Sequence, residues 1–122
     1  MHNFKELVIW KESMKLAKAT YLASANFPQD ERFGLTSQVR RSAVSVPSNI
    51  AEGAGRNSDK EFMNFLSIST GSSYELETQL LLSVDLGFVT EEEVQEALSN
   101  VTVVQKMLYR FQEQLKTKIE KR

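Results

Sequence analysis

Residues 35–56 read LTSQVRRSAVSVPSNIAEGAGR, and the pattern of this stretch sets the expected architecture. Its apolar residues recur every three or four positions, which is the spacing of one face of an α-helix. They are Leu35, Val39, Ala43, Val46 and Ile50. Polar residues recur at the same spacing along another side of the same helix. They are Gln38, Arg41, Ser45, Asn49, Glu52 and Arg56, and we call this set the polar stripe. The stretch therefore predicts an amphipathic helix with one buried face.

Pro47 lies inside this predicted helix. A proline there lacks the N–H that would bond the carbonyl of Ala43, which costs about 3 kcal/mol in an isolated helix. We expect packing to compensate this cost, so that one kinked helix forms over 35–55 rather than two helices. Gly53 and Gly55 are expected to end it. The same glycines resemble a phosphate-binding turn, but such a turn follows a strand and opens a helix, so a helix end is favoured.

Three further helices are predicted, over residues 5–25, 59–86 and 91–119, because their apolar residues show the same spacing. The apolar stripe of residues 5–25 consists of Leu7, Trp10, Met14, Ala17 and Tyr21. That of residues 59–86 consists of Phe62, Leu66, Ser69, Ser73, Leu76, Leu80 and Ser83, and that of residues 91–119 of Val94, Leu98, Val101, Leu108, Phe111 and Leu115. Strand patterns are absent from the sequence. The middle of the helix predicted over 59–86, Ser67 to Ser73 with the sequence SISTGSS, has small side chains, so we expect a close crossing between this helix and a neighbour.

Signals for helix ends separate the four predicted helices. Asn26-Phe27-Pro28 ends the first, and Gly87 is suited to end the third. Ser58 with Glu61, and Thr90 with Glu93, have the spacing of capping boxes that start the third and fourth. Connections this short predict an all-α, up-down antiparallel four-helix bundle with a Pro-kinked second helix, in a single domain over residues 1–122.

Composition excludes most kinds of enzyme site. The chain has no cysteine and a single histidine, His2, at an end that is expected to fray, which excludes disulfides, thiolate nucleophiles and the Glu-x-x-His sites of di-iron bundles. Glu75 and Glu77 would point about 160° apart on a helix, which does not make an acid–base pair. The longest apolar run, Leu7 to Trp10, is far shorter than the roughly 18 residues of a membrane span. We therefore expect a cytoplasmic protein with no enzymatic activity, metal, cofactor or membrane contact.

Charge is unevenly distributed along the chain although the net charge is only -1. Residues 75–96 contain seven carboxylates and no basic side chain. Basic residues gather on one face of the first helix and in the C-terminal segment. They are Lys11, Lys15 and Lys18, and Lys116, Lys118, Lys121 and Arg122. These residues are either a solvated surface that follows the helix dipoles or a contact for nucleic acid or an acidic protein. The slight acidity argues against strong RNA binding by a monomer, whereas an oligomer would repeat the basic patch.

Three interpretations of the polar stripe remain open. As a buried network it would fix helix register or a subunit interface, with Arg41 and Glu52 compensating one another. Glu75 and Glu77 of the third helix are alternative partners for these charges. As a surface, the stripe would line a small-ligand pocket between the second and third helices. Catalysis is the least favoured interpretation.

The segment from Gln38 to Gly53 resembles a motif of a known family, the small bacterial four-helix-bundle proteins named after reading frames in 23S rRNA intervening sequences. Further similar positions span nearly the whole chain. They are Leu7 with Trp10, Phe27-Pro28 followed by Glu31, Gly55-Arg56, Glu61-Phe62 with Phe65-Leu66, and Gly71-Ser72 followed by Glu75-Leu76-Glu77. The motif positions carried over to this chain are Arg40, Arg41, Ser45, Asn49, Glu52, Gly53, Arg56, Gly71, Ser72 and Glu75. We interpret them as positions that serve the fold and assembly.

This resemblance implies a bundle that assembles with copies of itself, with a five-fold ring favoured, and no established catalytic activity. The chain is similar, more distantly, to the accessory proteins of diversity-generating retroelements, pentameric bundles that contact a reverse transcriptase and nucleic acid through basic surfaces. It departs from them in being slightly acidic. We therefore expect a non-enzymatic, self-associating bundle that is an adaptor or scaffold for an RNA or protein partner. The alternative is a small-ligand-binding bundle that uses the polar stripe.

Overall fold

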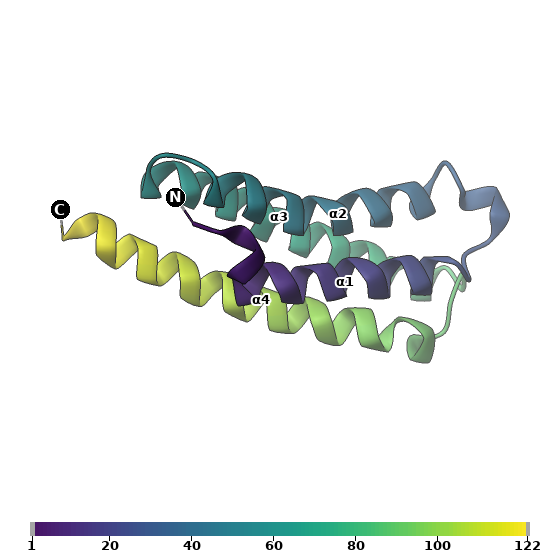
Figure 1. Cartoon of the computed structure of the whole chain (residues 1–122). Coiled ribbons are helices and arrows are strands. Elements are labelled where there is room, and N and C mark those ends of the chain that lie inside the picture. The colour runs from purple at the N-terminus through teal and green to yellow at the C-terminus, as the bar shows by residue number, and fades with distance from the viewer. Residues whose placement is uncertain (1, 122) are drawn as a thin grey trace.

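A computed structural model of the chain describes residues 2–121. Its long helices are α1 (Val8–Ser24), α2 (Leu35–Ala54), α3 (Asp59–Asp85) and α4 (Glu91–Glu120). Short 3-10 helices, η1 (Phe4–Glu6) and η2 (Gln29–Glu31), precede α1 and α2. Residues 2–121 contain no strand. Successive helices run in opposite directions, and the chain segments near both termini lie at the same end of the bundle (Figure 1).

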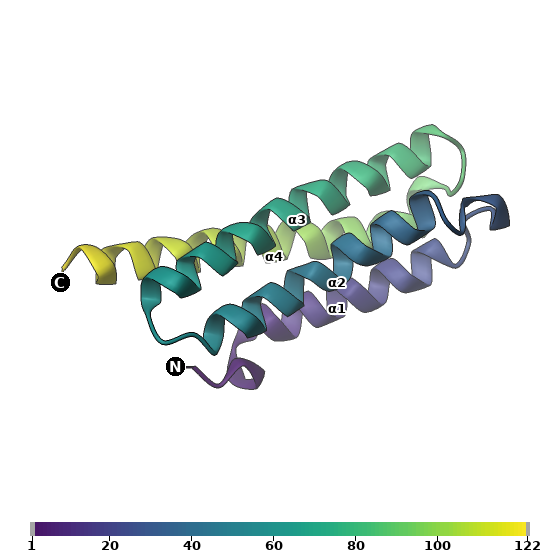
Figure 2. The same ribbon diagram turned by 90° about the horizontal axis from the view of Figure 1, so that it is seen from above.

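Each long helix packs against two neighbours. Helix α1 packs on α2 and α4, and α3 packs on the same two helices, so α1 and α3 are diagonally opposite. Figure 2 shows α1 and α2 along one side of the bundle and α3 and α4 along the other. The largest fully buried side chains come from all four helices. They are Leu16, Val39, Val46, Ile50, Phe62, Leu66, Leu76, Leu80, Val94, Val101, Val104 and Leu108. The predicted all-α four-helix bundle is confirmed.

The predicted bounds of α2, α3 and α4 agree with the structure to within one residue at each end. Helix α2 is continuous with Pro47 buried inside it, as one helix rather than two, and the kink stays a prediction. Its N-terminus is capped from the preceding turn, where a carboxylate oxygen of Glu31 accepts the N–H of Leu35 at 3.0 Å. A Cβ on the intervening Gly34 would lie 2.6 Å from that oxygen, so glycine leaves room for the cap.

All seven apolar-stripe residues predicted for α3 are buried. The three serines among them are satisfied by carbonyl oxygens, Ser69 by that of Val46 on α2 at 2.8 Å and Ser73 and Ser83 within α3. Ser58 caps the N-terminus of α3 through the N–H of Glu61. Gly87 has a positive φ of 75° just after the helix, a conformation that favours glycine. The predicted small face of α3 thus packs closely on α2.

The predicted buried face of α1 is wrong at two positions. Met14 and Tyr21 are 46% and 44% exposed, and the other three predicted residues are half-buried. The buried face consists of Ile9, Ser13, Leu16, Ala19, Thr20, Ala23 and Ser24. The hydroxyls of Ser13 and Thr20 donate to carbonyl oxygens one turn earlier in α1, at 2.6 and 2.9 Å. Because their own helix satisfies them, these polar residues can enter the core.

The start of the chain also differs from the expectation. Asn3 caps η1 by accepting the N–H of Lys5, and Leu7 is extended, so α1 begins at Val8 rather than near residue 5. His2 is not frayed in this structure. Its backbone N–H donates to the carbonyl oxygen of Ala54 at 2.9 Å, and its ring packs on Phe62 with 5.1 Å between the ring centroids.

Helix α4 begins with the predicted capping box, in which Thr90 accepts the N–H of Glu93 and Glu93 accepts the N–H of Thr90. At its other end α4 extends past the ends of α2 and α3 (Figures 1 and 2). Leu115 is the last buried residue of α4, and residues 116–118 are exposed. The predicted basic C-terminal segment is therefore an overhang of the bundle.

Candidate functional site

The polar stripe of α2 lies at the edge of the contact with α3 and is not a buried core network. Four of its members are exposed and two are half-buried. Gln38, Arg41, Glu52 and Arg56 are exposed, and Ser45 and Asn49 are half-buried. Its charged ends therefore remain in contact with solvent, and only its short central residues are packed between helices.

The middle of the polar stripe joins α2 to α3 through short side chains. The hydroxyl oxygens of Ser45 and Ser72 lie 2.8 Å apart. Asn49 Nδ2 donates to the carbonyl oxygen of Ser45 at 2.8 Å and to its hydroxyl oxygen at 2.9 Å. Because these side chains are small, the two helix backbones approach closely, and no buried side-chain nitrogen or oxygen among the described residues lacks a hydrogen-bond partner. Ser45, Asn49 and Ser72 thus make contacts that hold the fold together.

A polar pocket of about 260 Å³ lies beside this contact. It is lined by Gln38, Arg41, Ser42, Ser45, Ser72, Glu75 and Gln79. The buried hydroxyl of Ser42 lies 2.9 Å from a carboxylate oxygen of Glu75 and 3.0 Å from the amide oxygen of Gln79. The sequence did not single out Ser42 or Gln79, because neither belongs to the polar stripe. The pocket combines one guanidinium, one carboxylate and several neutral polar groups, a set suited to a small polar molecule.

The predicted compensation between Arg41 and Glu52 is not formed. Glu52 instead pairs with Arg56 one turn away, at 3.1 Å. The alternative partners are also engaged elsewhere, Glu75 by Ser42 and Glu77 by the amide of Gln105 on α4 at 3.0 Å. Residues 41 and 52 are separated by about 16 Å along the helix, so their side chains are too far apart to pair. Within residues 2–121, Arg41 has no hydrogen bond or ion pair.

Three other motif positions contact neighbouring helices of the same chain. Arg40 Nε donates to the hydroxyl of Ser24 at 2.9 Å, and its guanidinium lies 4.7 Å from the ring centroid of Tyr21, so it ties α2 to α1. Arg56 stacks on the Phe65 ring of α3 at 4.8 Å. Gly53 is buried, and a Cβ there would lie 2.7 Å from Phe65 Cβ and 2.8 Å from Phe62 Cδ1. This glycine is needed for the close approach of α3.

Gly71, by contrast, is exposed on α3, and a Cβ at this position would meet nothing within 4 Å. No close approach within the chain requires a glycine here. The predicted assembly role of Gly71 stays a prediction.

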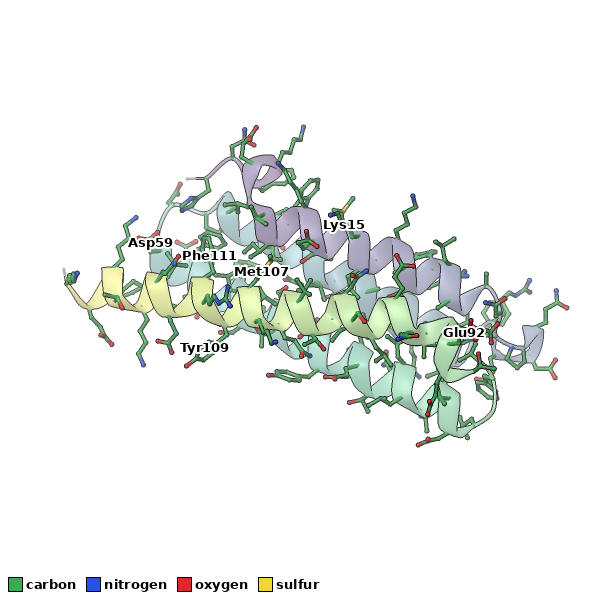
Figure 3. All side chains as sticks on the ribbon, turned by 90° about the horizontal axis from the view of Figure 1, so that it is seen from below. Lys15, Asp59, Glu92, Met107, Tyr109 and Phe111 are labelled. Atoms are coloured by element: carbon green, nitrogen blue, oxygen red, sulfur yellow. The ribbon has the colours of Figure 1, made fainter. Side chains whose placement is uncertain are left out.

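The predicted basic contact residues are exposed in two separate places. Lys11, Lys15 and Lys18 lie on the outer side of α1, where Lys15 pairs with Glu12 at 3.2 Å. Lys116, Lys118 and Lys121 lie on or just after the overhang of α4, where Lys118 reaches Asp59 at the start of α3 at 3.5 Å. Arg122 lies outside the described residues. Figure 3 shows Lys15 on α1 and α4 between α1 and α3.

A hollow of about 480 Å³ on the α1–α2 side is lined by residues that the sequence analysis did not group. We call it the arginine patch. It consists of Arg32, Arg40 and Arg41 with Tyr21, Phe33, Thr36, Ser37 and Val44, and none of these lining residues is acidic. Arg32 stacks on the adjacent ring of Phe33 at 4.7 Å.

A larger groove of about 810 Å³ lies on the α3–α4 side, and we call it the acidic groove. Its apolar residues are Leu81, Val84 and Leu98, its acidic residues are Asp85, Glu91 and Glu92, and Gln95, Ser99 and Thr102 complete it. Figure 3 shows Glu92 at the end of the bundle where α3 connects to α4. Three consecutive leucines, residues 80–82, exceed what one helix face can bury, and this excess is the sequence signal that could have revealed the groove.

Among residues 2–121, no group of three or more His, Cys, Asp or Glu side chains is arranged to hold a metal ion. None of the described helices combines the length and the apolar character needed to cross a bilayer.

Comparison with known proteins gives a family match and a similar solved structure. The family model described as 23S rRNA-intervening sequence protein matches residues 5–110, from η1 to most of α4. The fold is similar to the crystal structure of a protein of unknown function from the S23 ribosomal protein family of Bacteroides thetaiotaomicron VPI-5482. That similarity has a TM-score of 0.76 and 25% sequence identity, and it covers 85% of this chain and 97% of the other. Comparison with curated proteins gave no match.

Proposed function

Since the chain belongs to the 23S rRNA-intervening sequence protein family, as its motifs predicted, we propose that it is a non-enzymatic, self-associating bundle that acts as an adaptor or scaffold. Its partner is proposed to be RNA or a ribonucleoprotein, and its place of action the cytoplasm. The assembly is proposed to be a closed ring, with five copies favoured by the resemblance.

The observation that carries this proposal is the number of large apolar side chains left on the outside of a bundle whose core is complete. Phe33 is 85% exposed, Tyr109 66% and Leu22 62%. Two of these residues lie beside other exposed aromatic residues. Phe33 lies in the arginine patch with Tyr21, and Tyr109 lines a hollow of about 420 Å³ together with Tyr74. Contiguous apolar surface of this kind marks contact sites for other macromolecules.

The charges support an anionic partner at two places. The outer side of α1 carries Lys11, Lys15 and Lys18, and the overhang of α4 carries a second basic cluster. Each copy in an assembly would repeat both clusters, which offsets the slightly acidic total charge locally, because fields act over about 8–10 Å at physiological salt. Phosphate groups of RNA are suited to such repeated lysines.

Native mass spectrometry of protein purified gently from its own cells tests this proposal. A species of several subunits that carries RNA or a second protein is expected, and its mass gives the number of copies. A bare monomer at micromolar concentration would contradict the self-association. An assembled species with nothing attached would contradict the scaffold role.

A second candidate function is the binding of a small polar molecule in the pocket beside the polar stripe. The specific observation is that Arg41 and Glu75 both line this pocket without pairing to each other. A zwitterion could bind between these opposite charges. A thermal-shift screen with the free amino acids tests it, and a stabilisation that disappears in Arg41→Gln with unchanged melting of the free protein would favour ligand binding.

A further inference from the structure

We infer that the arginine patch of one copy docks into the acidic groove of a second copy. The inference rests on the proposed self-association and names the two surfaces that it uses. One surface comes from α1, α2 and their connection, and the other from α3 and α4.

The charges of the two surfaces are complementary. The arginine patch contains three guanidinium groups, and none of its lining residues is acidic. The acidic groove contains Asp85, Glu91 and Glu92, and residues 75–96 include no basic side chain. The opposite charges attract the patch of one copy to the groove of another. Like charges disfavour contacts of groove with groove or of patch with patch.

Among the described residues, no charged side chain of these two surfaces forms an ion pair within the chain. In residues 2–121, the side chains of Arg41, Asp85 and Glu92 have no ion pair or hydrogen bond. Arg32 contacts only the ring of its neighbour Phe33, at 4.7 Å. Apart from Arg40, which donates to Ser24, these charges are therefore available to a partner without breaking a polar contact between helices.

The apolar parts match as well. In the arginine patch, the ring of Phe33 is 85% exposed and Val44 is exposed beside it. In the acidic groove, Leu81 and Leu98 offer apolar surface below the carboxylates. Because the Arg32 guanidinium stacks on the Phe33 ring, the two form one unit that can present the ring to the leucines and the charge to the acidic rim. Aromatic and arginine side chains that enter a pocket are typical anchors of protein interfaces.

The positions of the two surfaces suit a repeating assembly. The α1–α2 connection and the α3–α4 connection lie at the same end of the bundle, and the two helix pairs lie on opposite sides (Figure 2). Each copy would thus offer its patch to one neighbour and its groove to the other. Such a head-to-tail contact forms a ring when the rotation between copies closes. Because both surfaces lie toward this same end, successive copies can stay level, as a ring requires.

The test is a charge swap in the full chain, read by native mass spectrometry and light scattering. Arg32→Glu with Arg41→Glu reverses the patch, and Asp85→Lys with Glu92→Lys reverses the groove. Each double variant is expected to weaken self-association by at least about tenfold. The chain with all four substitutions restores complementary surfaces and is expected to assemble again, which a merely misfolded variant would not do. Arg40 and Glu93 are left unchanged because they contact the fold and the helix cap.

A matched control separates the docking contact from total charge. Lys11→Glu with Lys18→Glu changes the net charge by the same amount as the patch variant, but on the outer side of α1. It is expected to assemble like the wild type while losing affinity for a single-stranded RNA oligonucleotide.

The outcomes separate this inference from the proposed function. A monomeric wild type would overturn the self-association and this inference with it. Wild-type assembly in both double variants would overturn only the pairing of patch and groove. Dissociation of the control to the same extent would also overturn it, because total charge would then explain the effect. Loss of RNA binding with intact assembly in the patch variant would assign the arginine patch to RNA instead.

Discussion

Helix α3 contacts its two neighbours in different ways. Against α2 it presents side chains with little bulk. Ser69 donates across the contact to the carbonyl oxygen of Val46 at 2.8 Å, and Ser72 meets Ser45 at 2.8 Å. Gly53 of α2 lies directly against the Phe65 side chain. We call this contact the α2–α3 seam.

Against α4, the same helix is joined by longer side chains. Gln105 reaches Glu77 at 3.0 Å, and Lys118 reaches Asp59 at 3.5 Å. Both contacts lie towards the surface, and grooves remain between the helices outside the core. We call this contact the α3–α4 seam.

The difference shows that side-chain size decides whether a helix contact serves mainly the stability of the bundle or leaves a surface for binding. Small residues bring backbones together and leave room only for the polar pocket at the edge of the α2–α3 seam. Larger residues at the α3–α4 seam leave a surface groove about three times that volume, 810 against 260 Å³. We therefore expect substitutions in the α2–α3 seam to change stability and those beside the α3–α4 grooves to change binding.

Phe62→Ala should have the largest effect because Phe62 belongs to both seams. It is 1% exposed, it packs beside Gly53, and its ring lies 5.3 Å from that of Phe111 on α4. The free energy of unfolding in urea should fall by about 3–5 kcal/mol. The exposed Phe33→Ala is the control and should change it by less than about 0.5 kcal/mol. Equal losses of unfolding free energy in both variants would contradict the assignment of Phe62 to the core and Phe33 to the surface.

The two glycines of the motif test the α2–α3 seam directly. Gly53→Ala places a methyl group against Phe65 and Phe62, so the free energy of unfolding should fall by about 1–3 kcal/mol. Gly71→Ala adds the same group in open space and should raise it by about 0.5–1 kcal/mol. Urea titrations of the two variants should therefore shift in opposite directions. A shift in the same direction would mean that the seam is not closely packed at residue 53.

Ser69→Ala removes the hydrogen bond to the carbonyl oxygen of Val46 across the α2–α3 seam. We expect a loss of about 1 kcal/mol in the free energy of unfolding. The matched control is Ser67→Ala, whose exposed hydroxyl donates to Met63 of its own helix and accepts a hydrogen bond from Gln112 of α4 at 3.3 Å, but makes no contact across the α2–α3 seam. The control should change stability by less than about 0.5 kcal/mol. An unchanged Ser69→Ala would show that proximity alone, without the hydrogen bond, holds the seam.

Lys118→Met should have the smallest effect, because the lysine of this ion pair at the α3–α4 seam is 58% exposed, although the Asp59 side chain is 13% exposed. The loss in stability should be less than about 1 kcal/mol, and it should disappear in high salt. Lys116→Met is the control for loss of a nearby positive charge. A larger loss that persists in salt would show that the overhang of α4 is held to α3 more firmly than the geometry indicates.

Much of the fold could be predicted from the sequence because strict spacing and end signals agree in α2, α3 and α4. The serines of α3 were placed correctly because they continue an unbroken stripe of large residues. The face of α1 could not be placed this way. Ser13 and Thr20 count as polar in any pattern, and only their hydrogen bonds to α1's own carbonyl oxygens permit burial.

The candidate surfaces were less predictable than the fold. The arginine patch combines Tyr21 at the end of one helix with Arg32 and Phe33 in a connection, so no helical spacing links them. The family motif in residues 38–56 pointed to assembly, yet most of its side chains contact neighbouring helices of their own chain. A single sequence does not show whether the residues of a family motif serve packing within the chain or binding to a partner.

Hydrogen exchange in the overhang of α4 can show whether a partner is bound there. A helix end that is held to the bundle by little more than one ion pair, here Lys118 with Asp59, opens locally at far lower free energy than the whole bundle, so its amide hydrogens exchange early with deuterium. Residues 116–120 should therefore take up deuterium long before the buried turns around Leu108. Any partner that covers the overhang would slow this uptake. Peptide-level exchange thus detects a bound partner at this end of the bundle before its chemical nature is known.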